Sequence, residues 1–342
     1  MNLRRKETSP TIPWLRPEAC RPVLRYLKNI GVPLDRFIER NRLPSHRWGE
    51  NRDIIPRHAF GCFLTDITRS QGIEKLGWEA VHWLRKLADN NVYSIQYAPT
   101  LYQALKDKVA HSKAVCSIEV GLVERQHSLL LSRRQSFALS DHDHEMAWFM
   151  MATFLGVVRG YVGQDWRPAR MGVPSGAMEP WVSEELPDIQ IETDERHWWF
   201  EIPRHYLILA PPGLASTTGC KAREQSAERG ALIGLDYPSI LAGVIRAYLP
   251  SGAPSLEVAA DLLGTSPRTM RRRLHQANHS YRKVLAGVQF RRAKELLDSG
   301  DSKIIDIANE VGFESASNFT RAFRSFTGMT PTEYRRRSPS PR

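Results

Sequence analysis

Apolar residues recur at helical spacing near the start of the chain. Between residues 23 and 87 they fall at positions i, i+3 and i+4 in four successive segments, which turn-forming residues such as Gly31, Pro33 and Pro44 separate. This pattern predicts a series of amphipathic helices. Residues 1–16 are basic, contain proline and lack the pattern, so we expect them to be frayed.

The middle of the chain mixes strand and helix patterns. A helix is expected to begin near Thr100, a residue type that suits an N-cap. Apolar and polar residues then alternate over 114–123 and 128–135, which predicts a β-hairpin, and two further short strands are predicted at 188–193 and 197–202.

A long helix is predicted between these two pairs of strands. Ser140 and Asp141 would cap its beginning, and it would run to about Val162. Its most apolar part, residues 146–158, is too short to cross a bilayer and is followed by Arg159. The pattern therefore indicates a buried core helix.

The last third of the chain has a different residue pattern from the rest. Residues 210–236 are rich in small, polar, proline and glycine residues and are interpreted as a linker between domains. From Tyr237 onward the pattern is helical and predicts no strand. This part contains a near-repeat: residues 256–274 resemble residues 304–323, with alanine, glycine and an apolar pair at corresponding places.

Each copy of the repeat has the residue types of a helix-turn-helix. Ala260 and Ala308 would let two helices approach closely, and Gly264 and Gly312 would permit the tight turn between them. Ser266 in the first copy, and Ser315 or Glu314 in the second, would cap the helix that follows. One stripe of that helix is apolar and would pack inside the domain: Met270 and Leu274 in the first copy, Phe319, Phe323 and Phe326 in the second.

The opposite face of each second helix carries donors that suit DNA. Arginine can form two hydrogen bonds with guanine, asparagine can do the same with adenine, and further arginines can neutralise phosphates. A solvated helix face explains one such helix equally well, but two copies in the basic part of the chain favour DNA binding. The predicted faces comprise Arg268, Arg271, Arg272 and His275, and Ser317, Asn318, Arg321 and Arg324.

Residues 237–337 resemble the DNA-binding domain of the AraC/XylS family of bacterial transcription regulators. The resemblance rests on "SPRTMRRRL", "RRAKELL", "IIDIANEVGF", "SNFTRAFRSFTGMTP" and "EYRR". It implies two helix-turn-helix motifs that read successive major grooves about one DNA turn apart, with the helix at 280–300 as the spacer. The positions that it assigns to base reading are Arg268, Arg271, Arg272, Ser317, Asn318 and Arg321. Its framework positions are Gly312, Phe313, Phe323, Gly328 and Pro331.

One position departs from the family pattern. The family usually has arginine four residues before Ala293, whereas this chain has Gln289. The departure concerns one backbone or framework contact, for which Arg291 or Arg292 could substitute.

The first 210 residues resemble the sensor domain of the subgroup related to ornithine-utilisation and virulence regulators. The resemblance rests on "GVPLDRFIERNRLP", "DIIPRHAFGCFL", "DWRPARMGV" and "FEIPRHYLILAPP". It implies a mixed α/β domain that binds a small-molecule effector and forms a homodimer. The expected fold is thus an α+β sensor domain at 1–209, a linker at 210–236, an all-α double helix-turn-helix domain at 237–337 and a tail at 338–342.

Charge and cysteine content agree with this reading. The chain of 342 residues has a net charge of +11. Residues 251–342 hold 16 Lys/Arg against 9 Asp/Glu, so most of the excess lies in the predicted DNA-binding part. Four widely spaced cysteines without a C-x-x-C pair suit a reducing cytoplasm. Expected partners are promoter DNA, RNA polymerase, an effector and a second copy of the chain, and no membrane.

Three other features admit a functional interpretation. Asp141, His142, His144 and Glu145 could suggest a metal site, but residues so close in sequence mostly diverge on a helix, so a capping role is favoured. Trp198 and Trp199 could line a ligand pocket, although core packing is favoured and neighbours on a strand point to opposite faces. The basic tail at 335–342 could touch phosphates or be disordered.

The sequence contains no phosphate loop, no G-x-S-x-G and no H-E-x-x-H. We therefore expect no enzymatic activity, no cofactor and no metal. Three alternatives to an effector-responsive regulator remain open: an architectural DNA-binding protein, a sensor domain that only dimerises, and an enzyme that DNA binding targets. Activation and repression are both compatible with the sequence.

Overall fold

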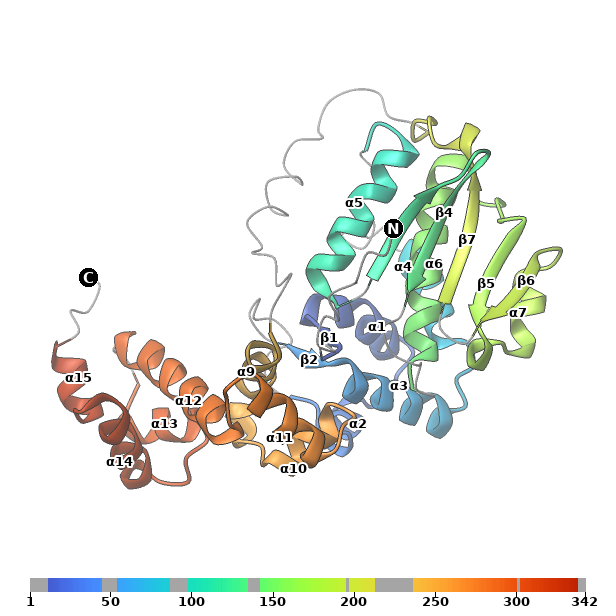
Figure 1. The fold of residues 1–342 in the computed structure, drawn as a ribbon. Helices are drawn as coiled ribbons and strands as arrows, with labels where there is room; N and C mark the ends of the chain where they lie inside the picture. The colour runs from blue at the N-terminus through green and yellow to red at the C-terminus, as the bar shows by residue number, and fades with distance from the viewer. Residues whose placement is uncertain are drawn as a thin grey trace. The chain divides into compact units, whose positions relative to one another are not determined.

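A computed structural model describes residues 12–44, 54–86, 98–117, 119–134, 142–194, 197–212, 236–299 and 302–337 (Figure 1). Of these residues, those up to Pro17, those from 38 to 59 and those after 234 form one compact unit, called unit 1. The other described residues form unit 2. The predicted domain boundaries stay a prediction, and most of the predicted linker lies outside the described residues.

Unit 2 is built on a sheet with the strand order β3-β4-β7-β5-β6. Strands β3, β4, β7 and β5 pair antiparallel, whereas β6 pairs parallel with β5. The strands are β3 (Glu119–Glu124), β4 (Ser128–Arg134), β5 (Arg170–Pro174), β6 (Gln190–Asp194) and β7 (His197–Pro203).

The register gives the sheet one buried face. Leu131 pairs with Phe200 and Arg133 with Trp198, and all four side chains are buried. Helix α5 (Leu101–Val115) packs against β3 and against α6 (His144–Val162), which in turn packs against β7 (Figure 1). Almost the whole of α6 is buried because its sequence is apolar all round. The sheet, α5 and α6 therefore enclose the core of unit 2.

Other helices complete this half of the chain. α4 packs against α6, and Gly77 makes the close approach possible, since a Cβ on it would lie 2.0 Å from the Glu145 carbonyl oxygen. The bounds of these helices are α1 (Pro17–Asn29), α2 (Leu34–Arg40), α3 (Arg57–Gln71), α4 (Leu76–Lys86) and α7 (Pro180–Glu185). Of these, α1 and α3 begin in unit 1 and α2 ends in it. Single 3₁₀ turns lie at Ser175–Ala177 and Arg204–Tyr206.

The sequence predicted much of unit 2. The helices, the 128–135 strand, the Thr100 cap and the burial of residues 146–158 are confirmed, because the Thr100 hydroxyl accepts the Gln103 N–H and α6 lies in the core. The predicted caps Ser140 and Asp141 lie outside the described residues.

Three details of the strand prediction were wrong or incomplete. The first strand of the hairpin begins at Glu119 rather than 114, because α5 continues to Val115. The two strands predicted at 188–193 and 197–202 are confirmed as β6 and β7, but the prediction did not include β5, which lies between them in the sheet. β5 itself was missed because Gly172 and Pro174 interrupt its strand pattern. The strands β1 (Trp14–Leu15) and β2 (Ile55–Pro56) were missed because two residues are too few for a periodic signal.

Unit 1 combines the β1-β2 pair with a helical part that extends to Arg337. No strand lies among the described residues after 236, as predicted. The helices are α9 (Tyr237–Tyr248), α10 (Leu256–Leu262), α11 (Pro267–Gln276), α12 (Tyr281–Asp298), α13 (Ile304–Glu310), α14 (Ala316–Thr327) and α15 (Pro331–Arg337), with a 3₁₀ turn at Leu249–Ser251 after α9. The structure thus has the predicted fold class, with the sheet in the first part of the chain and an all-helical C-terminal part.

The β1-β2 pair is in close contact with the helical part of unit 1. A Cβ on Gly243 of α9 would lie 2.5 Å from the Ile54 methyl group, and a Cβ on Gly264 would lie 2.8 Å from Cγ of His58. Glycine at these two positions therefore allows residues 54–58 to pack on the first helices of the C-terminal part.

Candidate nucleic-acid interface

The two copies of the repeat form two helix-turn-helix motifs with the same backbone hydrogen bonds. In the first copy, α10 and α11, Gly264 has φ +61° and the Thr265 N–H donates to the Ala260 carbonyl at 2.9 Å. In the second, α13 and α14, Gly312 has φ +77° and the Phe313 N–H donates to the Ala308 carbonyl at 2.9 Å. This pattern ends a helix through a left-handed glycine. The predicted role of both glycines is confirmed.

A serine caps the second helix of each motif. The Ser266 hydroxyl accepts the Thr269 N–H and the Ser315 hydroxyl accepts the Asn318 N–H, both at 3.2 Å. Of the two predicted caps for the second motif, Ser315 is therefore the one used. A cap of this kind satisfies an N–H that the helix leaves unpaired.

The apolar stripe of each second helix packs as predicted, with one exception. Met270 and Leu274 of α11, and Phe319 and Phe323 of α14, are at most 3% exposed. Phe326 was predicted inside but is 56% exposed, although its ring lies 4.6 Å from that of Phe290. The prediction that Phe326 packs inside the domain is therefore confirmed only for its ring contact, and the prediction that it is buried is wrong. Phe326 belongs to the last turn of the helix.

The residues predicted to read bases lie on the exposed faces of the two helices. On α11, Arg268, Arg271 and Arg272 are exposed, and Arg271 lies 3.4 Å from Glu257 in an ion pair that is open to solvent on both sides. On α14, Ser317, Asn318 and Arg321 are exposed. Within the described part of the chain, Arg268, Arg272 and Arg321 form no hydrogen bond or ion pair, so their donors remain available to a ligand.

Two neighbouring side chains of α11 differ in their orientation. His275 is exposed on the same face of α11. Arg273, by contrast, turns toward the domain, and its guanidinium lies 5.5 Å from the centre of the Tyr237 ring. A cation–π contact therefore uses Arg273 to attach α11 to α9.

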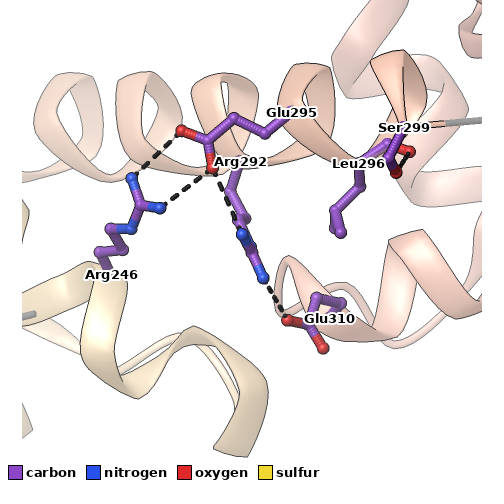
Figure 2. A network of polar contacts seen from close by, with 6 residues as sticks. All are labelled: Arg246, Arg292, Glu295, Leu296, Ser299 and Glu310. Atoms are coloured by element: carbon purple, nitrogen blue, oxygen red, sulfur yellow. Dashed lines mark hydrogen bonds and ion pairs between the residues drawn. The ribbon is translucent and has the colours of Figure 1, made fainter. Parts of the chain in front are cut away.

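A network of ion pairs joins the two motifs through α12. Arg246 of α9 donates to both carboxylate oxygens of Glu295, at 3.2 and 3.0 Å (Figure 2). Arg292 donates to Glu295 at 3.3 Å and to Glu310 of α13 at 2.9 Å. The network thus links α9, which packs on α11, to α13 of the second motif. Sequence reasoning missed Arg246, Glu295 and Glu310, because nothing in the spacing of charges along the chain pairs them.

The position that departs from the family pattern has a role within the domain. The Gln289 side-chain amide donates to the Val311 carbonyl at 3.0 Å, at the end of α13. Gln289 therefore supplies a framework contact, and Arg292, one of the two arginines that could have substituted for the missing arginine, bonds to two glutamates instead. The other framework positions fit their predicted use: Gly328 has φ +79°, and Phe323 and Pro331 are buried.

The remaining candidate sites lie in unit 2. The His142 imidazole contacts the Thr65 hydroxyl at 3.2 Å, and Glu145 accepts the Gly77 N–H at 2.7 Å, so both residues have structural uses. The described residues hold no group of three metal-binding side chains. Trp198 is 1% exposed whereas Trp199 is partly exposed, as expected for neighbours on a strand. None of the described helices is both long and apolar enough to cross a membrane.

Comparison with known proteins agrees with the geometry. Residues 259–337 match a family model described as a helix-turn-helix domain. The chain is 33% identical over 191 residues to the ornithine utilization regulator of Pseudomonas aeruginosa, a match that covers 54% of this chain and 56% of that protein. It is 36% identical over 81 residues to the transcriptional regulator GadX of Escherichia coli, covering 24% of this chain and 29% of that protein.

The chain therefore spans about half the length of the first of these relatives and under a third of the second. Among solved structures, the transcriptional regulator CdpR from Pseudomonas aeruginosa aligns over 92% of this chain and 97% of its own, with 20% identity and a TM-score of 0.40.

Proposed function

We propose that this chain, whose residues 259–337 match a helix-turn-helix domain family, is a sequence-specific transcription regulator of the AraC type that responds to an effector. One observation carries the proposal: two motifs of the same construction each bury one stripe of their second helix and leave arginine, serine and asparagine donors open on the other. Those donors match the base edges of the major groove.

The two open faces differ in chemistry, and this difference favours specific recognition. α11 offers three arginines, whereas α14 offers Ser317, Asn318 and Arg321. Two unlike faces read an asymmetric sequence, while an architectural protein needs only phosphate contacts and deformable DNA. The ion pairs of Arg246 and Arg292 would hold the two faces at a fixed spacing (Figure 2).

We further propose that the sensor domain binds an effector and pairs two copies of the chain at a promoter, where RNA polymerase is engaged. An effector acts in this way only if it binds one of two conformations more tightly. The relatedness to an ornithine utilization regulator supports a metabolic signal. The proposal places the protein in the cytoplasm and assigns it no catalytic step and no cofactor.

The test is selection of bound sequences from a pool of random duplexes by the full chain at physiological salt, followed by footprinting on the best site. A motif with two blocks centred about 10 base pairs apart, bound at least 10³-fold more tightly than random DNA, is expected. Equal affinity for all duplexes, with steep dependence on salt, would instead identify an architectural protein.

A further inference from the structure

The turn of each helix-turn-helix motif packs against a residue from outside that motif. A Cβ on Gly312, in the second motif, would lie 2.8 Å from the backbone nitrogen of Ala253 and 3.0 Å from its Cβ. A Cβ on Gly264, in the first motif, would lie 2.8, 2.9 and 3.1 Å from the Cγ, Nδ1 and Cδ2 atoms of His58. These distances leave no space for a side chain, so both turns are in direct van der Waals contact with their partners.

The two partners come from different parts of the chain. Ala253 lies in the segment between α9 and α10, within the helical C-terminal part. His58 is the second residue of α3 and comes far earlier in the chain, yet it belongs to the same compact unit as both motifs. The second motif is therefore supported from within the C-terminal part, whereas the first motif takes its support from the N-terminal part.

Residues 54–58, called the supporting segment, form a small structure that depends on unit 1. Strand β2 of this segment pairs with β1, and the Arg57 N–H donates to the Pro13 carbonyl at 3.1 Å. Two strands of two residues each are not stable on their own. Ile54 and Ile55 are nevertheless only 2% exposed, and β2 packs against α9. The supporting segment therefore owes its conformation to the helices on which it packs.

The supporting segment is connected to α11 through α9. The Ile54 methyl group lies 2.5 Å from the place of a Cβ on Gly243, in the middle of α9. Tyr237, at the beginning of α9, contacts the guanidinium of Arg273 from α11 at 5.5 Å. α9 thus lies between the supporting segment and the first reading helix, and it contacts both.

A second connection runs through the turn. The His58 ring contacts Gly264, and Ser266, two residues further on, caps the beginning of α11. The arginines that face outward from α11 follow directly after this cap. The supporting segment therefore acts on α11 at its N-terminal end as well as along its packed side.

Base reading depends on the exact placement of such a helix. An arginine recognises guanine only when two of its N–H groups meet the N7 and O6 acceptors at hydrogen-bonding distance and angle. A small rotation of α11 therefore changes which base edges its arginines meet. The same rotation leaves α14 in place, because the second motif has contacts of its own from Ala253 and Gln289.

We infer that the supporting segment positions α11 for base reading, with the ring of His58 against the Gly264 turn as the decisive contact. The inference rests on the proposed function, in which α11 and α14 read separate blocks of one DNA site. It goes further by adding a positioning residue from the part of the chain that the sequence assigns to the sensor domain, and by naming the motif that this residue serves.

The alternative is that the supporting segment only stabilises unit 1. In that case His58→Ala lowers the melting temperature and weakens recognition of both blocks alike, because both motifs belong to this unit. If the segment positions α11, the loss is confined to the bases that α11 reads. The two accounts therefore differ in where along the DNA site the preference is lost.

The experiment is selection of bound sequences from random duplexes by the full chain at one salt concentration. Arg272→Ala identifies the block that α11 reads. In that block, His58→Ala should weaken the sequence preference about five- to tenfold, and it should leave the other block unchanged. His58→Phe keeps a flat ring against the turn and should retain most of the preference.

Two further variants serve as controls. Gln71→Ala changes an exposed, uncharged residue at the other end of α3 and should select the same site as the wild type. Gln289→Leu removes the contact to the Val311 carbonyl in the second motif and should show the reverse pattern, with the loss in the block that α14 reads. Thermal melting of each variant without DNA measures its stability separately.

The outcomes separate this inference from the proposed function. If His58→Ala keeps the preference in both blocks, or loses it equally in both, the inference is wrong and the regulator stands. If His58→Phe loses as much as His58→Ala, the ring contact is not the decisive one and the inference is also wrong. If the wild type selects no two-block site at all, the proposed function fails and the inference fails with it.

Discussion

Arg246 and Glu295 form a bidentate ion pair that joins α9 to α12, with N–O distances of 3.2 and 3.0 Å (Figure 2). Glu295 also accepts from Arg292, which in turn reaches Glu310 in the second motif. One carboxylate therefore connects the two helix-turn-helix motifs. The network therefore braces the helix α12 against both motifs.

Replacing Glu295 by alanine should lower the free energy of unfolding by about 1 kcal/mol, since three charge-assisted bonds are lost at a side chain that is 37% exposed. Affinity for the selected site should fall more than affinity for either half of it, because the spacer loosens. Urea unfolding and mobility shifts measure the two effects. Arg291→Ala, an exposed change on the same helix, is the control for stability and should leave the free energy of unfolding unchanged.

Gly264→Ala should cost about 2–3 kcal/mol of stability. Its φ of +61° disfavours any residue with a Cβ, and the new methyl group would lie 2.8 Å from Cγ of His58. In a His58→Ala background the steric part of the cost should disappear and the backbone part remain. If Gly264→Ala lowers stability equally in that background, the side chain of residue 58 does not contact the turn at Gly264.

Gly287→Ala is the matched control for this prediction. Gly287 lies within α12 with open space where its Cβ would be. Alanine should therefore raise the free energy of unfolding by about 0.5–1 kcal/mol. Chemical denaturation of the single and double variants tests both glycines together.

Gln289→Leu should destabilise the second motif by about 1 kcal/mol, because it leaves the Val311 carbonyl without its side-chain donor. Hydrogen exchange of α13 and α14 should accelerate, while α10 and α11 keep their protection. Gln276→Leu, at an exposed position of α11, is the comparison. Equal acceleration in both motifs would contradict a local role for Gln289.

Stability should decline between about pH 4.5 and pH 7 through Glu145. Burial, together with the nearby Glu179, raises the pKa of Glu145 to about 7, against the hydrogen bond from the Gly77 N–H. A folded-state pKa above the unfolded value means that the stabilisation is present at low pH and is lost as the pH rises through 7. Glu145→Gln should remove about 1–2 kcal/mol of this dependence and be the more stable protein at pH 8.

The C-terminal part could be predicted from sequence because local signals decide it. Gly264 and Gly312 are needed for a left-handed turn, Ser266 and Ser315 suit N-caps, and the apolar stripes have helical spacing. Signals of this kind can be recognised in the sequence without knowledge of the rest of the fold. Phe326 was assigned wrongly because periodicity does not show where a helix leaves its core.

The strand pairing of unit 2 and the long-range polar contacts of unit 1 could not be predicted. β5 separates β6 from β7 although β6 and β7 are neighbours in sequence, and only long-range packing selects that order. The partners Arg246 and Glu295 are 49 residues apart. In the sequence, Lys108 is one lysine of a polar segment, and only the structure shows that it is buried.

The central claim is that two different helices read two different blocks of one DNA site. The most direct test is selection of bound sequences from random duplexes with the wild type, Arg272→Ala and Asn318→Ala at one salt concentration. Each variant should lose sequence preference in one block, at about 1–3 kcal/mol per base position, and keep it in the other block about 10 base pairs away. Uniform weakening on all sequences by both variants would contradict the claim, because it would mean that these helices contact only the DNA backbone.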